Sequence, residues 1–130
     1  MNRPLKVLLA EDNPVNQKVA LRLLERLGYA ADVVRDGMEV IEALTHQFYD
    51  VVLMDMNMPR LDGLATTRRI CREWHPAIRP RIVAITASTT EEDRRLCLEA
   101  GMDDYVSKPL RLDELSRVLR DCRPLELSQV

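Results

Sequence analysis

The 130-residue sequence lacks several features that mark whole classes of proteins. No apolar run approaches the ~20 residues that a membrane-spanning helix needs, and the N-terminus lacks the basic-then-apolar pattern of a signal peptide. We therefore expect no membrane contact and a cytoplasmic location. The cysteines Cys71, Cys97 and Cys122 are odd in number, far apart and without a metal-binding spacing. This pattern indicates free thiols in a reducing compartment rather than disulfides or a zinc site.

A basic surface and nucleotide-binding motifs are also missing. The formal net charge is −2, and the arginines are mixed with acids on predicted helices and loops, so we expect no nucleic-acid partner. Neither a G-x-G-x-x-G fingerprint nor a P-loop is present, which argues against nucleotide binding. With 46% hydrophobic residues, the chain has enough apolar material for one sizeable core and therefore for a single domain.

Short apolar runs alternate with segments of helical periodicity. The runs are mostly unalternated and predict strands buried on both faces, at residues 6–10, 30–34, 51–55 and 81–86, and residues 104–107 form a weaker, less apolar fifth strand signal. This alternation predicts an α/β fold, in which five helices cover a five-stranded parallel sheet on both faces. We expect a flavodoxin-like, doubly wound sheet with strand order 2-1-3-4-5.

Start and stop signals bound the predicted helices. Asn13-Pro14 starts the first helix and Gly28 ends it, while Asp36-Gly37 is a predicted turn before the second. A capping box at 89–92 starts the fourth helix, and Gly101 closes it. The predicted buried faces comprise Val19, Ala20, Leu23, Leu24 and Leu27 in the first helix; Met38, Ile41 and Leu44 in the second; Leu64, Thr67, Ile70, Cys71 and Trp74 in the third; and Leu112, Leu115, Val118, Leu119 and Cys122 in the last.

Acidic side chains gather where the first and third predicted strands end. Glu11 and Asp12 follow the first strand, and Asp55 ends the third. In the expected strand order these strands are neighbours, and ligands bind at the carboxyl edge between them. Carboxylates ~4 Å apart repel by roughly 1 to 4 kcal/mol, so a positive group must compensate. The candidates are Lys108, which follows the fifth strand, and a hard cation such as Mg²⁺. No Cys or His lies at this edge, so zinc is not expected.

An aspartate beside a metal and a lysine can accept a phosphoryl group. The carboxylate attacks phosphorus while the positive groups neutralise the equatorial oxygens, and Thr86 can donate its hydroxyl to one of them. Each residue alone has an ordinary structural explanation, such as a helix-start acid or a solvated lysine. Their coincidence at the carboxyl ends of different strands favours a site.

These residues resemble the signature of response-regulator receiver domains of two-component signalling. The resemblance extends from about Leu5 to Cys122, and the sequences of residues 11–17 and 54–59 are most similar to those of receivers in hybrid sensor histidine kinases. We expect a receiver domain over residues 1–124 and a frayed tail over 125–130, either stand-alone or excised from a longer protein. The matching positions are Glu11-Asp12, Asp55, Met58-Pro59, Asp62-Gly63, Thr86-Ala87, Tyr105 and Lys108-Pro109.

The resemblance implies a phosphoacceptor role for Asp55. The donor is a phosphohistidine on a histidine kinase or histidine phosphotransfer protein. Mg²⁺, for which Mn²⁺ can substitute, binds Asp12, Asp55 and the backbone carbonyl of Asn57, with Glu11 acting through a water. Lys108 pairs with Asp55 and then with the phosphoryl oxygen. The Lys108-Pro109 bond is expected to be cis, a form that is accessible before proline.

The resemblance also implies a conformational switch. The Thr86 hydroxyl moves toward the phosphoryl group, and the Tyr105 ring turns into the vacated space. The readout lies on the fourth helix, fifth strand and fifth helix, a face through which receivers also dimerise. Asn57 and Ser88 flank the attacking water and help to set the phosphate lifetime. Such a domain catalyses its own phosphorylation and slow dephosphorylation, but it is a signalling switch rather than an enzyme.

Two other readings compete with this one. A phosphatase of the haloacid dehalogenase type also uses an aspartate nucleophile after a core strand, but it needs a second carboxylate two residues on, where this chain has Asn57. A degenerate receiver would serve only as a binding scaffold. No degeneration is visible, since the acids, the acceptor, the hydroxyl residue and the lysine are all present.

Overall fold

The computed structural model describes residues 4–58, 60–88 and 90–125, so Pro59 and Thr89 of the predicted motifs lie outside the described residues. The strands lie within one residue of the predicted ranges: β1 (Val7–Ala10), β2 (Ala31–Val34), β3 (Val51–Asp55), β4 (Arg81–Thr86) and β5 (Asp104–Ser107). The helices alternate with them: α1 (Pro14–Arg26), α2 (Gly37–His46), α3 (Gly63–Glu73), α4 (Glu91–Ala100) and α5 (Leu112–Arg120). No helix in the described ranges is long and apolar enough to span a membrane.

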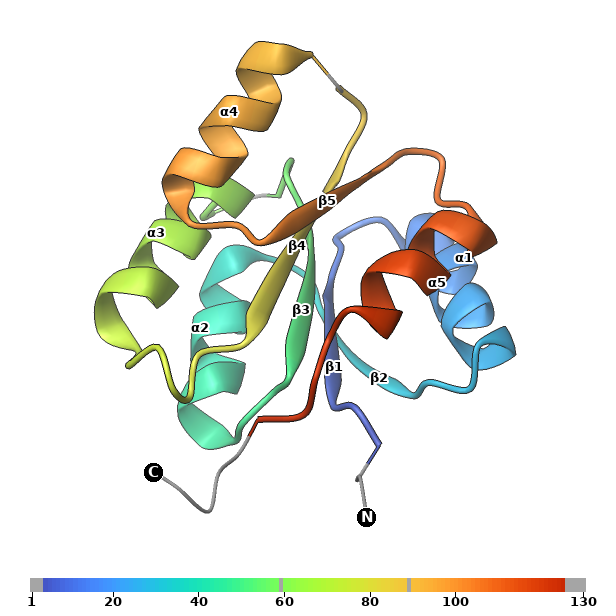
Figure 1. The fold of residues 1–130 in the computed structure, drawn as a ribbon, viewed down its shortest axis with the longest axis horizontal. Helices are drawn as coiled ribbons and strands as arrows, with labels where there is room; N and C mark the ends of the chain where they lie inside the picture. The colour runs from blue at the N-terminus through green and yellow to red at the C-terminus, as the bar shows by residue number, and fades with distance from the viewer. Residues whose placement is uncertain (1–3, 59, 89, 126–130) are drawn as a thin grey trace.

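The sheet has the predicted topology. All strand pairs are parallel, and the order is β2-β1-β3-β4-β5. Figure 1 shows α1 and α5 on one face of the sheet and α2, α3 and α4 on the other. Every residue of β3 is buried: Val52 and Met54 belong to the core layer under α2 to α4, and Val51 and Leu53 to the layer under α1 and α5. This two-sided burial explains why the strands read as unalternated apolar runs.

The helix ends follow the polar and glycine signals of the sequence. The Asn13 side chain caps α1, and Gly28 and Gly101, with φ of 89° and 109°, follow α1 and α4 in the left-handed conformation that favours glycine. Thr90 caps α4 by accepting the N–H of Asp93. The cap is therefore one residue later than the capping box predicted from Thr89.

Two apolar residues that were predicted to face the core are exposed instead. Val19 is 46% exposed and Met38 is 40% exposed. Gly37 is already the first residue of α2, so Asp36-Gly37 starts a helix and is not the predicted turn. The buried stripe runs from Gly37 at helical spacing, which leaves Met38 at its edge. Val19 lines a surface cavity beside the segment that follows β5.

Both ends of the described chain meet at the amino end of β3. The Lys6 N–H donates to Asp50 Oδ2 at 2.7 Å, and the Leu125 N–H donates to Asp50 Oδ1 at 2.8 Å. Leu125 was predicted to be frayed, yet the structure gives it this hydrogen bond. The remainder of the predicted tail lies outside the described residues, and the boundary at residue 124 stays a prediction.

Candidate functional site

Three carboxylates meet at the carboxyl edge of the sheet. Ala10 lies opposite Met54 in the β1–β3 register, so Glu11 and Asp55 come next to each other beyond it. One carboxylate oxygen from each of Glu11, Asp12 and Asp55 lies within 4.8 Å of the others. Glu11 and Asp55 are only 3% and 2% exposed, whereas Asp12 is half-buried. The structure thus brings together the acidic residues that the strand order predicted.

Asp55 is held by one side-chain donor and one backbone donor. The Lys108 Nζ donates to Asp55 Oδ1 at 2.9 Å, and the Asn57 N–H donates to the same oxygen at 3.0 Å. Lys108 reaches Asp55 from beyond β5, and its backbone N–H donates to the Thr86 carbonyl at 2.8 Å. The peptide bond between Lys108 and Pro109 is cis. This partly buried ion pair neutralises one charge of the acidic cluster.

The remaining crowding changes the acidity of Glu11. Burial raises the pKa of Glu11 to about 7, and a hydrogen bond to Asp55 and the charge of Asp55 add to the increase. The Asn13 N–H and the Lys108 ammonium oppose it. This environment therefore favours the neutral form of the Glu11 carboxyl group more than water does.

The donor set fits a hard divalent cation. The three residues offer carboxylate oxygens, which Mg²⁺ prefers, and neither His nor Cys is among them. Asn57 is the second residue after β3, and its N–H donates to Asp55. A role for its carbonyl as a fourth ligand stays a prediction.

The Thr86 hydroxyl is engaged within its own loop rather than with Asp55. Its Oγ1 donates to the Ser88 carbonyl at 3.1 Å and accepts the Ser88 N–H at 3.1 Å. The Ser88 hydroxyl in turn donates to the Asp93 carboxylate, and this contact, with a second one from Thr90, lowers the pKa of Asp93 below its ordinary value. Thr86 and Ser88 line a cavity of about 310 Å³ together with Asn57 and residues of α4. The hydroxyl therefore has adjoining space in which to change partner.

Tyr105 lies on β5, half-buried, and is positioned by α4. The Arg94 guanidinium carbon lies 5.1 Å from the centre of the Tyr105 ring, a cation–π distance. In the β4–β5 register, Tyr105 lies opposite Ala84, two residues before Thr86. The two predicted switch residues are thus near one another in the fold, and their coupling stays a prediction.

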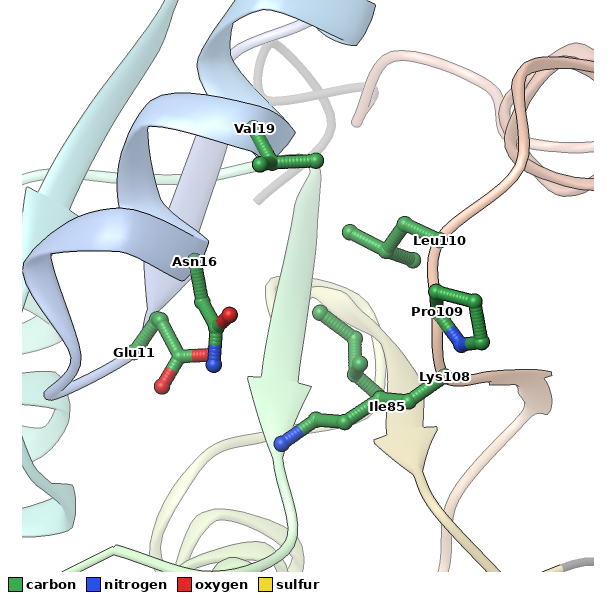
Figure 2. Close-up of a pocket in the computed structure, with 7 residues that line it drawn as sticks. All are labelled: Glu11, Asn16, Val19, Ile85, Lys108, Pro109 and Leu110. Carbon is green, nitrogen blue, oxygen red and sulfur yellow. The ribbon is translucent and has the colours of Figure 1, made fainter.

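A cavity of about 360 Å³ opens beside the acidic cluster (Figure 2). Figure 2 shows the Lys108 ammonium reaching from one wall toward the side that carries Glu11 and Asn16. The other lining residues are Val19, Ile85, Pro109 and Leu110. Sequence reasoning missed this cavity. The signal that could have indicated it is the pair Val15 and Val19, two apolar residues one helical turn apart that α1 leaves exposed.

Comparison with known proteins agrees with this geometry. The response regulator receiver domain, as a family, matches residues 7–120 of the chain. The chain belongs to the response-regulator receiver family. This receiver is 44% identical over 125 residues to histidine protein kinase 1 of Candida albicans. The match covers 89% of the receiver and 5% of the kinase, so the chain spans only a small part of that relative.

Two solved structures are also similar to the receiver. The receiver domain of a sensor histidine kinase of Pseudomonas aeruginosa, with a magnesium ion in its active-site cleft, is 42% identical with a TM-score of 0.80, and the match covers 92% of this chain and 97% of that one. The receiver of a Saccharomyces cerevisiae response regulator, solved with a histidine phosphotransfer protein, is 25% identical with a TM-score of 0.82, over 93% of this chain and 90% of that one. The chain is a receiver domain of two-component phosphorelay signalling.

Proposed function

We propose that Asp55 is the phosphoacceptor of this receiver and that the reaction depends on Mg²⁺. The observation that supports this most strongly is the Asp55 carboxylate itself. It is 2% exposed, ion-paired with Lys108 at 2.9 Å, and grouped with two further carboxylates at the edge of the sheet where ligands bind. Burying an acid beside two others costs free energy, and clusters of this kind are concentrated at functional sites.

The chemistry follows from how Asp55 is held. Lys108 and the Asn57 N–H both donate to Oδ1, so attack through Oδ2 leaves these contacts in place. A carboxylate oxygen bonds to phosphorus as the bond from phosphorus to the donor imidazole breaks, and the nitrogen keeps the electron pair. The Lys108 ammonium then neutralises charge on the phosphoryl oxygens.

The acidic cluster would hold the metal. Asp12, Asp55 and the Asn57 carbonyl would bind Mg²⁺ directly, with Glu11 acting through a water, and Mn²⁺ would substitute. The bound cation supplies charge neutralisation for the phosphoryl oxygens. The carboxylate cluster and the magnesium found in the Pseudomonas relative support this assignment.

The phosphorylated state would be read through Thr86 and Tyr105. The Thr86 hydroxyl would leave Ser88 for a phosphoryl oxygen, and the Tyr105 ring would turn inward, which changes the face formed by α4, β5 and α5. A shift from 1:99 to 99:1 between two such arrangements needs about 5.5 kcal/mol of differential stabilisation. Asn57 and Ser88 would flank the attacking water and set the lifetime of the phosphate. The same face would also form a homodimer.

The donor in this proposal is a histidine kinase or a histidine phosphotransfer protein. The histidine kinase relative and the yeast complex support that class of partner. Three free cysteines are consistent with a reducing, cytoplasmic location. The domain would promote its own phosphorylation and slow dephosphorylation while acting as a switch rather than as an enzyme with separate substrates.

Intact-protein mass spectrometry with acetyl phosphate, with and without Mg²⁺, tests the assignment. We expect one base-labile phosphate adduct that requires Mg²⁺ and is absent from Asp55→Asn. An adduct that persists in Asp55→Asn would contradict the choice of acceptor. If acetyl phosphate gives none, the same measurement with a phosphorylated histidine phosphotransfer protein decides between a partner-specific receiver and a binding scaffold.

A further inference from the structure

The loop that follows β3 contains the strained backbone position of the site region. Residues 56–62 connect β3 to α3, and Arg60 in this loop has φ of 64°. It is the sole non-glycine residue with positive φ among residues 4–58, 60–88 and 90–125. The left-handed conformation is unfavourable for a residue with a Cβ atom, so contacts elsewhere must stabilise it.

A bidentate ion pair between Arg60 and Asp36 supplies such contacts. Arg60 Nε donates to Asp36 Oδ2 at 2.8 Å, and its Nη2 donates to Asp36 Oδ1 at 3.1 Å. The Asp36 side chain is 8% exposed and also accepts the Glu39 N–H, which caps α2. The planar guanidinium matches both carboxylate oxygens, a geometry that lysine cannot reproduce.

The backbone of α2 holds the same part of the loop. The Gly37 N–H donates to the Leu61 carbonyl at 3.2 Å. A Cβ atom on Gly37 would lie 2.0 Å from Thr66 Oγ1 and 2.3 Å from the Leu61 oxygen, so only glycine allows this approach. The middle of the loop is thus fixed to the start of α2 by both side chain and backbone.

The two ends of the loop are fixed to the acidic site. The Met56 N–H donates to the Ile85 carbonyl at 3.1 Å, and the Asn57 N–H donates to Asp55 Oδ1 at 3.0 Å. The Gly63 N–H closes the loop onto the Met56 carbonyl at 3.3 Å. In the sequence, Asn57 therefore follows the anchor of Met56 on β4 and precedes the anchors of Arg60 and Leu61 at the start of α2.

We propose that Arg60 and Asp36 are positioning residues for the Mg²⁺ and phosphoryl site. Their ion pair holds the loop in the conformation that directs the Asn57 backbone toward Asp55. This inference rests on the proposed function, because it assigns the loop to the metal site. Neither residue belongs to the acidic cluster, and Arg60 acts from the outer side of the loop.

Mg²⁺ titrations followed by NMR on the purified chain test the proposal. We expect Arg60→Ala and Asp36→Asn each to weaken Mg²⁺ binding about fivefold, less than the about tenfold loss typical of a direct outer-shell partner. Asn at position 36 keeps a capping oxygen for α2, so this variant removes the charge and one of the two oxygens that accept from Arg60 while it spares the cap. The double variant should have the same Mg²⁺ affinity as whichever single variant binds the ion less tightly. Arg60→Lys should bind Mg²⁺ more tightly than Arg60→Ala but less tightly than the unmodified chain.

Two controls separate positioning from general stability. Arg69→Ala removes an ion pair of 2.7 Å to Glu73 on α3, away from the loop, and should leave Mg²⁺ affinity unchanged. Tyr49→Phe removes a hydrogen bond of 2.7 Å to Asp32 and should lower stability without changing Mg²⁺ affinity. In metal-free protein, hydrogen exchange of the Asn57 amide should become about fivefold faster in Arg60→Ala and stay unchanged in both controls.

The possible outcomes are distinct. If the unmodified chain binds Mg²⁺ and Arg60→Ala binds it within about twofold, the positioning role is overturned while the proposed function stands. A loss of stability in Arg60→Ala with unchanged Mg²⁺ affinity and unchanged exchange of Asn57 also overturns it. If the unmodified chain shows no saturable Mg²⁺ binding, the proposed function fails and this inference fails with it.

Discussion

The strand β3 has a buried aspartate near each of its ends, and the two have opposite environments. Asp50, immediately before the strand, and Asp55, its last residue, are each 2% exposed. Asp50 accepts backbone N–H groups from Lys6 and Leu125. Asp55 accepts one backbone N–H and the Lys108 ammonium, and two further carboxylates lie beside it. Burial alone therefore does not distinguish the two aspartates, whereas crowding with like charge is found only around Asp55 of this pair.

The same contrast extends along both edges of the sheet. At the amino edge, Asp103 accepts the Ile82 N–H at 2.8 Å and so ties β4 to the segment before β5. At the carboxyl edge, burial and Asp55 raise the pKa of Glu11 to about 7. Asp50 and Asp103 at the amino edge thus accept backbone N–H groups, whereas Glu11, Asp12 and Asp55 at the carboxyl edge lie close to one another.

Replacing Asp55, at the carboxyl edge, should have the largest effect on phosphoryl acceptance. Asp55→Asn is expected to abolish phosphoryl acceptance completely, because an amide oxygen is too weak a nucleophile. The free energy of unfolding should change by no more than about 1 kcal/mol, since the lost ion pair is offset by relief of repulsion. Phosphate labelling measures the loss of phosphoryl acceptance, and chemical denaturation measures the change in unfolding free energy. A large loss of stability would mean that Asp55 has the structural role that we assign to Asp50.

The corresponding change at the amino edge should show the reverse pattern. Asp50→Ala removes a charged acceptor from two backbone N–H groups, and we expect unfolding to become about 3 kcal/mol more favourable. The folded fraction should still accept phosphate at the normal rate. Urea denaturation with labelling at low urea measures both. Slow labelling of folded Asp50→Ala would break the distinction between the two edges.

Replacing the side-chain donor at the carboxyl edge should uncouple the switch. Lys108→Ala removes the ammonium at 2.9 Å from Asp55 but none of the acidic residues, so Mg²⁺ binding should persist. The response of α4 to phosphorylation, or to a beryllofluoride mimic, should be lost. NMR chemical shifts of the α4 amides measure this response. If they change in Lys108→Ala as they do in the unmodified chain, the Lys108 ammonium is not required for coupling phosphorylation to α4.

The smallest expected effect is on the pH dependence of stability and involves Asp36, whose carboxylate accepts both a backbone N–H and the Arg60 guanidinium. The Arg60 guanidinium is the main cause that holds the pKa of Asp36 below its ordinary value of 3.8. A lowered folded-state pKa contributes stability that is present above pH 3.8 and is lost as the pH falls through the folded-state value. The difference in unfolding free energy between the unmodified chain and Arg60→Ala should therefore be constant near neutrality and vanish in acid. A difference that persists at the lowest pH would point to packing rather than charge.

The sequence predicted the sheet better than the helix faces. Strands β3 and β4 match their predicted ranges because burial on both faces makes each a largely apolar run. Strand β5 also matches its range, although only Val106 of its four residues is buried. Periodicity alone does not say how a helix is rotated against its sheet, so Val19 and Met38 were wrongly expected in the core. The rotation of α2 is set by the close approach of Gly37 to Thr66, a tertiary contact without a local signal.

For the site, strand order was enough to bring the acids and Lys108 together, because parallel strands end at one edge. The cis bond before Pro109 came from the family resemblance alone, since only about 5–6% of bonds before proline are cis in folded proteins. The pairing of Thr86 with Ser88 and of Arg60 with Asp36 could not be foreseen. Both depend on loop backbone conformations, which are set by tertiary contacts.

The shared attachment of Lys6 and Leu125 to Asp50 has an architectural consequence. The chain enters and leaves the fold at neighbouring points, on the end of the sheet away from the acidic cluster (Figure 1). A polypeptide segment joined at either point would start from the end of the sheet opposite the acidic cluster. The fold can thus be inserted into a longer chain while the edge that carries the acidic cluster stays accessible.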